Sequence, residues 1–189
     1  MTAQAATKFV VLSLITIVGC AGGRNDLRAD ASPPTIEVTS SLTPAAVASL
    51  RTKTIAVLPF EFVVMGEKEG IDENGTAEAV AAVLVANGLH LVERAQLDRV
   101  MREAELSLTD YVDETKAPQL GELVGADVLV FGSFAVDAPL DARAASVTLR
   151  FVDVATGAVI ATVEARGRSA TWASYDEWRR QLVTAATVQ

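Results

Sequence analysis

The stretch LGELVGADVLVFGSFAV, residues 120–136, contains a helix end, a glycine turn and a strongly apolar run. We expect a helix from about Thr115 to Gly125, because Pro118 suits its first turns and glycine suits a left-handed C-terminal position. The run from Asp127 to Val136 then predicts a strand that is apolar on both faces. Such a strand belongs at the centre of a sheet.

The residues after this strand alternate between apolar and polar. The segments SVTLRFVDV (146–154) and AVIATVEAR (158–166) both show the two-residue period of a half-buried strand. The connection DVATG, residues 153–157, combines a turn-forming aspartate with a glycine that tolerates positive φ, so the two strands are predicted to form a hairpin. Ser174 and Glu177 have the spacing of a capping box and predict a final helix that closes the sheet.

The N-terminal half of the domain predicts shorter elements. They are a strand at 54–60, a polar surface loop at 65–75, an apolar helix at 76–87, a strand at 89–94 and an amphipathic helix from Ala95. Thr43 followed by Pro44 predicts one more short helix start. Together these elements predict an α/β (α+β) fold, with a mixed sheet of about five strands flanked by helices and a C-terminal hairpin followed by a closing helix.

Composition limits the classes of partner. The chain of 189 residues is 50% hydrophobic, has a net charge of −8 and contains 1 cysteine. The hydrophobic content is enough for one well-packed domain. Nucleic-acid binding is not expected, because it depends on clustered lysine and arginine. A single cysteine cannot form an internal disulfide.

The first twenty residues look like an export signal. Lys8 precedes the run FVVLSLITIV, residues 9–18, which is too short to span a bilayer but suits the core of a signal peptide. The run ends in IVGC, which resembles the lipobox of bacterial lipoproteins, although Ile17 replaces the more usual leucine. That resemblance implies cleavage before Cys20, diacylglycerol on its thiol and an acyl chain on the new amino terminus. The alternative is an ordinary signal peptide cut near Gly23.

The expected organisation has three parts. These are a signal peptide at 1–19, the lipidated Cys20 with a flexible tether at 20–43, and the α/β domain at 44–189. The tether is rich in Gly, Ser, Thr, Asp and Pro and lacks periodicity. Ala21 in the second mature position is similar to lipoproteins sorted to the outer membrane, which implies an anchor on the periplasmic side of that membrane. Apart from the lipid on Cys20, no cofactor is expected.

The domain resembles the CsgG-like family of curli-assembly lipoproteins over about Lys53 to Arg168. The matching segments are KTIAVLPF (53–60), LVERAQLDRVMREAELSL (91–108), LGELVGADVLVFGSF (120–134) and RFVDVATGAV (150–159). The resemblance implies helices on a mixed sheet, a lipidated N-terminus, periplasmic placement and no catalysis. Secretion-channel members carry two further hairpins that form a pore. Only nine residues (137–145) and seven residues (167–173) stand at the matching sites here, so no pore is expected.

Few residues suggest chemistry. His90 starts an apolar strand and Cys20 lies in the leader, so no hydrolase triad and no zinc site can be assembled. The acidic loop with Glu67, Glu69, Asp72, Glu73 and Asn74 lacks the ligand spacing of an EF-hand and is interpreted as solvated. No metal site and no phosphate-binding loop are predicted.

Two pairs of residues remain as candidate sites. Glu93 and Arg94 belong to the family's strand-to-helix junction motif, and a structural ion pair or helix-start contact is the preferred interpretation. Trp172 and Trp178 are candidates for a partner interface, because tryptophan is enriched there, and core packing is the alternative.

The sequence therefore predicts a non-enzymatic, lipid-anchored accessory module that binds periplasmic or envelope proteins, or copies of itself. The alternative is a subunit of a CsgG-type outer-membrane curli or protein secretion complex. An envelope hydrolase is a distant third.

Overall fold

The computed structural model of the chain describes residues 35–71, 75–103, 114–137, 143–169 and 175–187. Within these residues, eight strands form one mixed sheet accompanied by five α-helices and a 3₁₀ turn. The strands are β1 (Thr35–Ser40), β2 (Thr54–Val57), β3 (Glu61–Val64), β4 (Glu67–Ile71), β5 (His90–Leu91), β6 (Val128–Asp137), β7 (Arg143–Asp153) and β8 (Val159–Ser169). The helical elements are α1 (Pro44–Leu50), α2 (Thr76–Ala86), α3 (Arg94–Glu103), η2 (Glu114–Lys116), α4 (Ala117–Val124) and α5 (Tyr175–Thr187).

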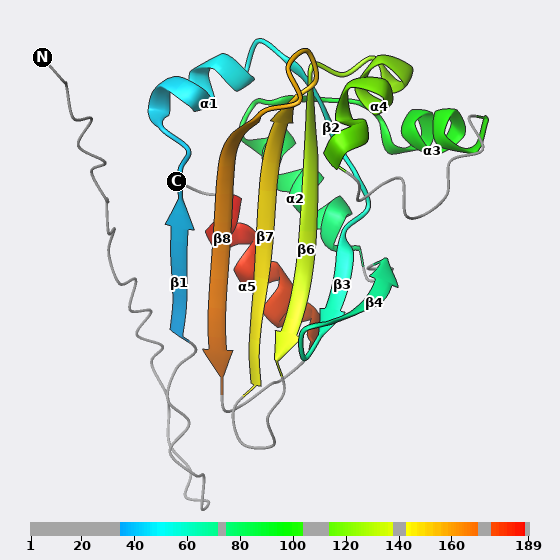
Figure 1. Cartoon of the computed structure of the whole chain (residues 1–189). Coiled ribbons are helices and arrows are strands. Elements are labelled where there is room, and N and C mark those ends of the chain that lie inside the picture. Colours follow the sequence, from blue (N-terminus) through cyan, green and yellow to red (C-terminus); the bar gives the residue numbers. More distant parts are fainter. Residues whose placement is uncertain (1–34, 72–74, 104–113, 138–142, 170–174, 188–189) are drawn as a thin grey trace, which may run out of the picture.

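The sheet has the order β1-β8-β7-β6-β2-β5, and off this path β3 pairs with both β6 and β4. Figure 1 shows β1, β8, β7 and β6 as neighbours. The predicted central strand is confirmed, because β6 pairs antiparallel with β7 on one side and parallel with β2 and β3 on the other. The predicted hairpin is confirmed as β7 and β8, and α5 follows it. The α+β class and the closing helix are therefore as expected.

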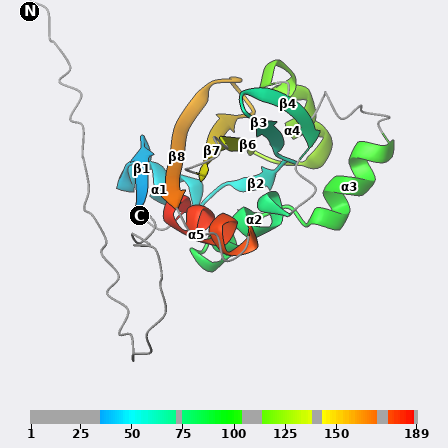
Figure 2. The same ribbon diagram turned by 90° about the horizontal axis from the view of Figure 1, so that it is seen from below.

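Helices α2 and α5 lie side by side on one face of the sheet (Figure 2). They pack on the inward side chains of the long strands, including Val147, Leu149 and Phe151, which are almost fully buried. This face follows from the alternation seen in the sequence, because every second residue of β7 points the same way. Burial of this apolar surface is the main stabilising contribution.

The opposite face of the sheet is covered at one end only. There α3 and α4 bury a second, smaller cluster that includes Ala56 and Leu58 from the β2 segment, Leu129 and Phe131 from β6, and Leu120 from α4. The helix α4 ends as predicted at Gly125, which has φ 69° and a left-handed conformation. The remaining length of β6, β7, β8 and β1 on this face carries no helix of the described chain (Figure 1).

The tether prediction is wrong at its C-terminal end. Residues 35–40 do not continue the tether but form β1, which pairs with β8 from Thr35↔Arg168 to Ser40↔Val163. The segment TIEVTS alternates, and its apolar residues Ile36 and Val38 pack against the α2/α5 core. Neighbouring Pro, Ser and Thr residues hid this short alternation in the sequence. The start of α1 is confirmed, because the Thr43 hydroxyl accepts the Ala46 N–H at 3.1 Å.

The predicted strand count of about five is too low for a second reason. The segment 65–75 was expected to be a loop, but Glu67–Ile71 forms β4, which pairs antiparallel with β3. Met65 and Gly66 both have positive φ, 52° and 86°, as a two-residue hairpin turn of type I′ requires. Charges in β4 concealed the strand, because an edge strand that faces solvent on both sides shows no apolar alternation.

Candidate functional site

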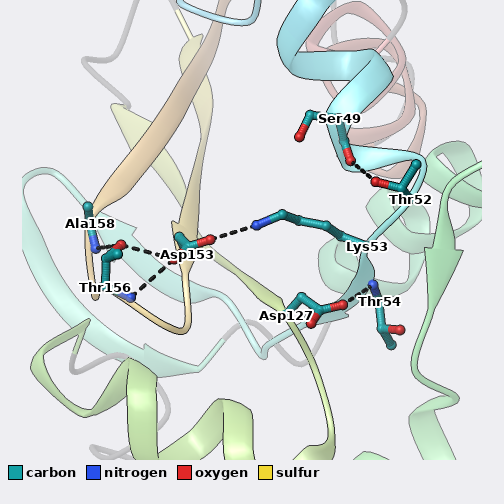
Figure 3. Close-up of polar contacts among 8 residues, drawn as sticks. All are labelled: Ser49, Thr52, Lys53, Thr54, Asp127, Asp153, Thr156 and Ala158. Atoms are coloured by element: carbon teal, nitrogen blue, oxygen red, sulfur yellow. Dashed lines mark hydrogen bonds and ion pairs between the residues drawn. The ribbon is translucent and has the colours of Figure 1, made fainter.

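The family segments meet at one end of the sheet in a polar cluster that we call the motif junction, formed by Lys53, Thr54, Asp127, Asp153 and Thr156 (Figure 3). Lys53 and Thr54 begin β2, Asp127 precedes β6, and the other two belong to the end of β7 and its turn. Because β6 lies between β7 and β2, the junction connects three neighbouring strands.

Asp127 joins the starts of β2 and β6. Its carboxylate accepts the Thr54 N–H at 2.8 Å, while its own N–H donates to the Thr54 carbonyl at 2.8 Å. Its carbonyl accepts the Val154 N–H at 3.0 Å. One aspartate therefore aligns both flanking strands with β6.

Asp153 organises the β7–β8 turn. Its Oδ1 accepts the N–H and the hydroxyl of Thr156 at 3.1 and 3.0 Å, and its Oδ2 accepts Lys53 Nζ at 2.7 Å. Gly157 has φ 68° and donates its N–H to the Asp153 carbonyl at 2.8 Å. The hydrogen bond from Lys53, followed by that from the Thr156 side chain, lowers the pKa of the Asp153 carboxyl.

The side chains of the motif junction are engaged in structural contacts. The charged groups of Lys53 and Asp153 are committed to each other, and Asp127 is committed to backbone N–H groups. The sequence motifs therefore mark the residues that fix strand register, a role that sequence reasoning gave to the turn beginning at Asp153 but not to Lys53 or Asp127.

Arg94 of the predicted junction motif lies at the start of α3. Its Nε is 2.9 Å from Asp98 Oδ1, one helical turn away, and its Nη1 is 3.7 Å from Glu78 Oε1 of α2. The Glu93 carbonyl accepts the first helical hydrogen bond, from Leu97 N–H at 3.0 Å. These contacts fit the structural interpretation of Glu93 and Arg94 and give neither residue a partner for chemistry.

Next to Arg94, a hollow of about 50 Å³ lies between α2, α3 and the β5 segment, lined in part by Glu78 and Leu91. Ligand pockets usually measure about 300–1,000 Å³, so this hollow cannot enclose a metabolite. Among the described residues, no cluster of His, Cys, Asp or Glu could hold a metal ion. Glu67 and Glu69 of the acidic segment stand in β4, and Asp72, Glu73 and Asn74 lie outside the described residues.

Cys20 and Trp172 lie outside the described residues, and Trp178 is described only as part of the backbone of α5. Their predicted roles as lipid attachment site and partner contacts remain predictions. No helix in the described part of the chain has both the length and the apolar character needed to span a membrane.

The helix-free part of the sheet presents a polar surface, which we call the open face. Its side chains are those that alternate with the buried ones on the four long neighbouring strands: Ser133 of β6; Ser146, Thr148 and Arg150 of β7; Thr162, Glu164, Arg166 and Arg168 of β8; and Glu37 and Thr39 of β1. Each strand places them in register, as in the row Ser133, Thr148, Glu164 and Thr39.

The charge of the open face differs from that of the chain. Its charged residues include the exposed Arg166 and Arg168, with Glu37 and Glu164, while Arg150 is half-buried with its Nε shielded from solvent; the whole chain has a net charge of −8. Arg166 Nε pairs with Glu164 on the same strand. Small hydroxyl side chains separate these charges. Because a hydroxyl can both donate and accept, the face offers hydrogen-bond donors and acceptors to a partner. Sequence alternation in β7 and β8 predicted its polar character, but not that the described helices would leave it without a covering layer.

The geometry defines a two-layer α+β domain that has a helix-covered core face, an open polar face and a structural motif junction. The chain belongs to the family described as Curli production assembly/transport component CsgG, which matches residues 40–138, a little over half of the chain. The resemblance stated from the sequence motifs is thereby confirmed.

Solved structures share the fold. The lipoprotein GNA1162 from Neisseria meningitidis is 18% identical with a TM-score of 0.54, and the match covers 70% of this chain and 93% of that one. The PelC dodecamer from Paraburkholderia phytofirmans is 16% identical with a TM-score of 0.53, covering 80% and 94%. The LpoB C-terminal domain from Salmonella enterica is 20% identical with a TM-score of 0.49, covering 64% and 90%. No curated protein matches the chain.

Proposed function

We propose that this chain is a non-enzymatic, lipid-anchored accessory protein on the periplasmic side of the bacterial outer membrane, and that it binds envelope proteins through the open face. The observation that carries the proposal is the open face itself. It is a polar surface of mixed charge, with Arg166 and Arg168 exposed on it, on an acidic family member whose motif residues are occupied by structural contacts.

A polar surface of mixed charge that extends over several strands suits protein partners better than small molecules. Small ligands need a concave pocket that buries most of their surface, whereas protein interfaces are extended and rely on many polar contacts. Arg166 and Arg168 are exposed at alternate positions on β8, and Arg166 pairs with Glu164 through Nε, so the two guanidinium groups place positive charge along this strand. An acidic partner surface fits this arrangement.

The lipid anchor is the second part of the proposal. It rests on Cys20 at the end of a short apolar run, and the similar fold of the Neisseria meningitidis lipoprotein GNA1162 supports it by analogy. Two or more acyl chains hold a protein on a bilayer durably, since each buried methylene contributes about 0.8 kcal/mol. Residues 20–34 would then link the anchor to β1.

Replacement of the anchor residue tests this part. Cys20→Ser should move the protein from the membrane fraction to the soluble periplasmic fraction, and mass spectrometry of the wild-type chain should show an acylated residue 20 as its first residue. An unmodified N-terminus near residue 23 in the wild-type chain would refute the anchor and leave an exported, unanchored domain.

Binding through the open face needs a separate test. We expect crosslinking in intact cells, followed by purification in detergent, to recover one or more specific envelope proteins with the wild-type chain. Arg166→Ala with Arg168→Ala should abolish that recovery. Arg99→Ala with Arg102→Ala on the exposed side of α3 removes the same charge elsewhere and should leave it unchanged. Equal recovery with both variants would exclude the open face.

A subunit of a secretion complex is the second candidate, and the family description as an assembly and transport component favours it. This candidate predicts that detergent-solubilised protein forms a ring of many copies. The accessory role predicts a small assembly bound to a different protein, so the mass of the solubilised complex separates the two.

A further inference from the structure

The described sheet has three edges, and they differ in how well they are protected. Strand β5 has only 2 residues, and β4 begins with Glu67, Lys68 and Glu69 followed by glycine. Strand β1 has 6 residues, one charged side chain and no proline. Natural proteins shield sheet edges by shortening them or by placing charges on them, because unpaired backbone groups recruit other strands. By these criteria β1 is the unprotected edge.

The hydrogen-bond pattern shows which backbone groups of β1 point away from the sheet. Ser41 N–H donates to the Thr162 carbonyl at 2.9 Å, so this pair is a hydrogen-bonded one. Pairs in an antiparallel ladder alternate, and the β1–β8 register therefore directs the backbone groups of Thr39, Glu37 and Thr35 toward β8. The N–H and C=O groups of Ile36, Val38 and Ser40 are directed outward.

The side chains of the same residues lie on the core face. Ile36 and Val38 pack against the α2/α5 core but remain only half-buried, because no described element lies beyond β1 (Figure 1). The outward backbone groups and the incompletely covered apolar side chains therefore belong to the same residues. A strand that paired with them would satisfy both.

We propose that β1 pairs antiparallel with β1 of a second copy of this chain, around a two-fold axis through Val38. In this register Val38 faces Val38 of the second copy, and Ile36 faces Ser40, so all three outward residues form hydrogen-bonded pairs. The two sheets become one continuous sheet, and the α2/α5 layers of both copies lie on the same face. Such an interface is isologous and closes at a dimer.

The sequence of β1 favours this register over its nearest competitors. Side chains of paired residues must lie on the same face, so the axis can pass through any residue of β1, and Glu37 and Thr39 give the registers nearest to Val38. An axis through Thr39 would place Ile36 opposite Leu42, which lies outside β1. An axis through Glu37 places two carboxylates directly opposite each other in a non-hydrogen-bonded pair, where the Cα atoms are only about 4.5 Å apart. The axis through Val38 places Glu37 opposite Thr39 instead, and brings two valines together.

The pairing uses the backbone edge of β1, and it does not depend on what the open face binds, although Glu37 and Thr39 of β1 also belong to that face. Its test is the mass of the full-length chain in detergent, measured by sedimentation or light scattering over a range of concentrations. The wild-type chain should be a dimer in equilibrium with a monomer. Val38→Pro removes an outward N–H and leaves the hydrogen bonds between β1 and β8 intact. Because the two-fold axis relates the two copies, the dimer loses two hydrogen bonds. We expect the dimer to be at least about ten-fold weaker.

The matched control is Val38→Ala, which shortens the same side chain but keeps the N–H. It should remain dimeric, and its melting temperature should be close to that of Val38→Pro if the proline leaves the fold intact.

A second measurement keeps the test valid if the proline variant does not fold. In a Cys20→Ala background, oxidation of a mixture of Glu37→Cys and Thr39→Cys chains should yield a crosslinked heterodimer, and Glu37→Cys alone should not crosslink.

Several results would overturn the proposal. These are a monomeric wild-type chain at about 100 μM, roughly ten times the dissociation constant expected of a weak dimer, an unchanged dimer in Val38→Pro, or crosslinking of Glu37→Cys alone. A ring larger than a dimer would also contradict it, because an isologous interface cannot propagate. A monomer that binds an extended segment of another protein at β1 would show that the edge is used, but by a different occupant.

Discussion

Lys53 and Asp153 are 100 residues apart in the sequence, and Lys53 Nζ lies 2.7 Å from Asp153 Oδ2. The contact connects the start of β2 with the end of β7, two strands that are separated in the sheet by β6. Both side chains are partly shielded from solvent, with 31% and 15% of their surface exposed. The pair therefore links the two strands that flank β6, at the motif junction.

Loss of this ion pair should lower stability without changing the fold. Lys53→Met keeps most of the aliphatic stem and removes the charge, so we expect the free energy of unfolding to fall by about 1 kcal/mol. Lys53→Arg should recover part of that loss. A double-mutant cycle with Asp153→Asn, measured by urea unfolding, should give a coupling of about 0.5–1 kcal/mol. Additive effects of the two substitutions would show that the contact contributes nothing.

The same pair predicts a pH dependence. Hydrogen bonds from Lys53 and Thr156 hold the folded pKa of Asp153 below its ordinary value of 3.8, so the folded state favours the ionised carboxylate. Its contribution is complete above the unfolded pKa and is lost as the pH falls from 3.8 through the lowered folded pKa. The stability difference between wild type and Asp153→Asn should therefore be constant at neutral pH and shrink below about pH 4. A difference that grows on acidification would contradict the assigned direction.

How far the sequence predicts the fold depends on whether an element has one apolar face or none. Val147, Leu149 and Phe151 alternate with polar residues, and the whole β7–β8 hairpin could be placed from that pattern. Strands β1 and β4 could not, because edge strands carry short or absent apolar patterns and are held by their neighbours' backbone. Local pattern therefore finds the core of the sheet and misses its borders.

The candidate site shows the same limit. Alternation predicts that Thr148 and Arg150 leave the α2/α5 face, but the sequence does not say whether another layer covers them. Coverage depends on where α4 packs, which is a long-range property. The motif junction was missed for a related reason. Asp127 and Asp153 resemble ordinary turn residues, and only the register of β6 and β7 brings them to the same end of the sheet.

The β3–β4 turn predicts a stabilising substitution. Met65 has φ 52° and its side chain is 68% exposed, so it has a left-handed backbone conformation without burying its apolar surface. Asparagine tolerates this conformation, and Asn-Gly is the preferred pair in type I′ turns. Met65→Asn should therefore raise the free energy of unfolding by about 0.5–1 kcal/mol. Met65→Val, whose β-branched side chain disfavours positive φ, should lower it, and thermal unfolding of the three proteins checks both directions.

Gly121→Ala should lower the stability of the protein, whereas helix propensity alone would predict that it raises it. Gly121 lies inside α4, where replacement of glycine by alanine normally stabilises by about 1 kcal/mol. At this position, however, an added Cβ would come within 2.2 to 2.9 Å of three side-chain atoms of Val154. Because Val154 is buried beneath the helix, it cannot move aside, and the overlap should cost about 1–3 kcal/mol. Gly121→Ala should thus lower the melting temperature.

The compensating change should show whether this overlap is the cause. Val154→Ala removes two of the three overlapping atoms, so Gly121→Ala should be less harmful in that background than in the wild type. Glu122→Ala, on the exposed side of the same helix, serves as the control and should be close to neutral. A stabilised Gly121→Ala protein would mean that α4 stands farther from the β7–β8 turn than the structure places it. The position of α4 would then not explain why helices cover only one end of this side of the sheet.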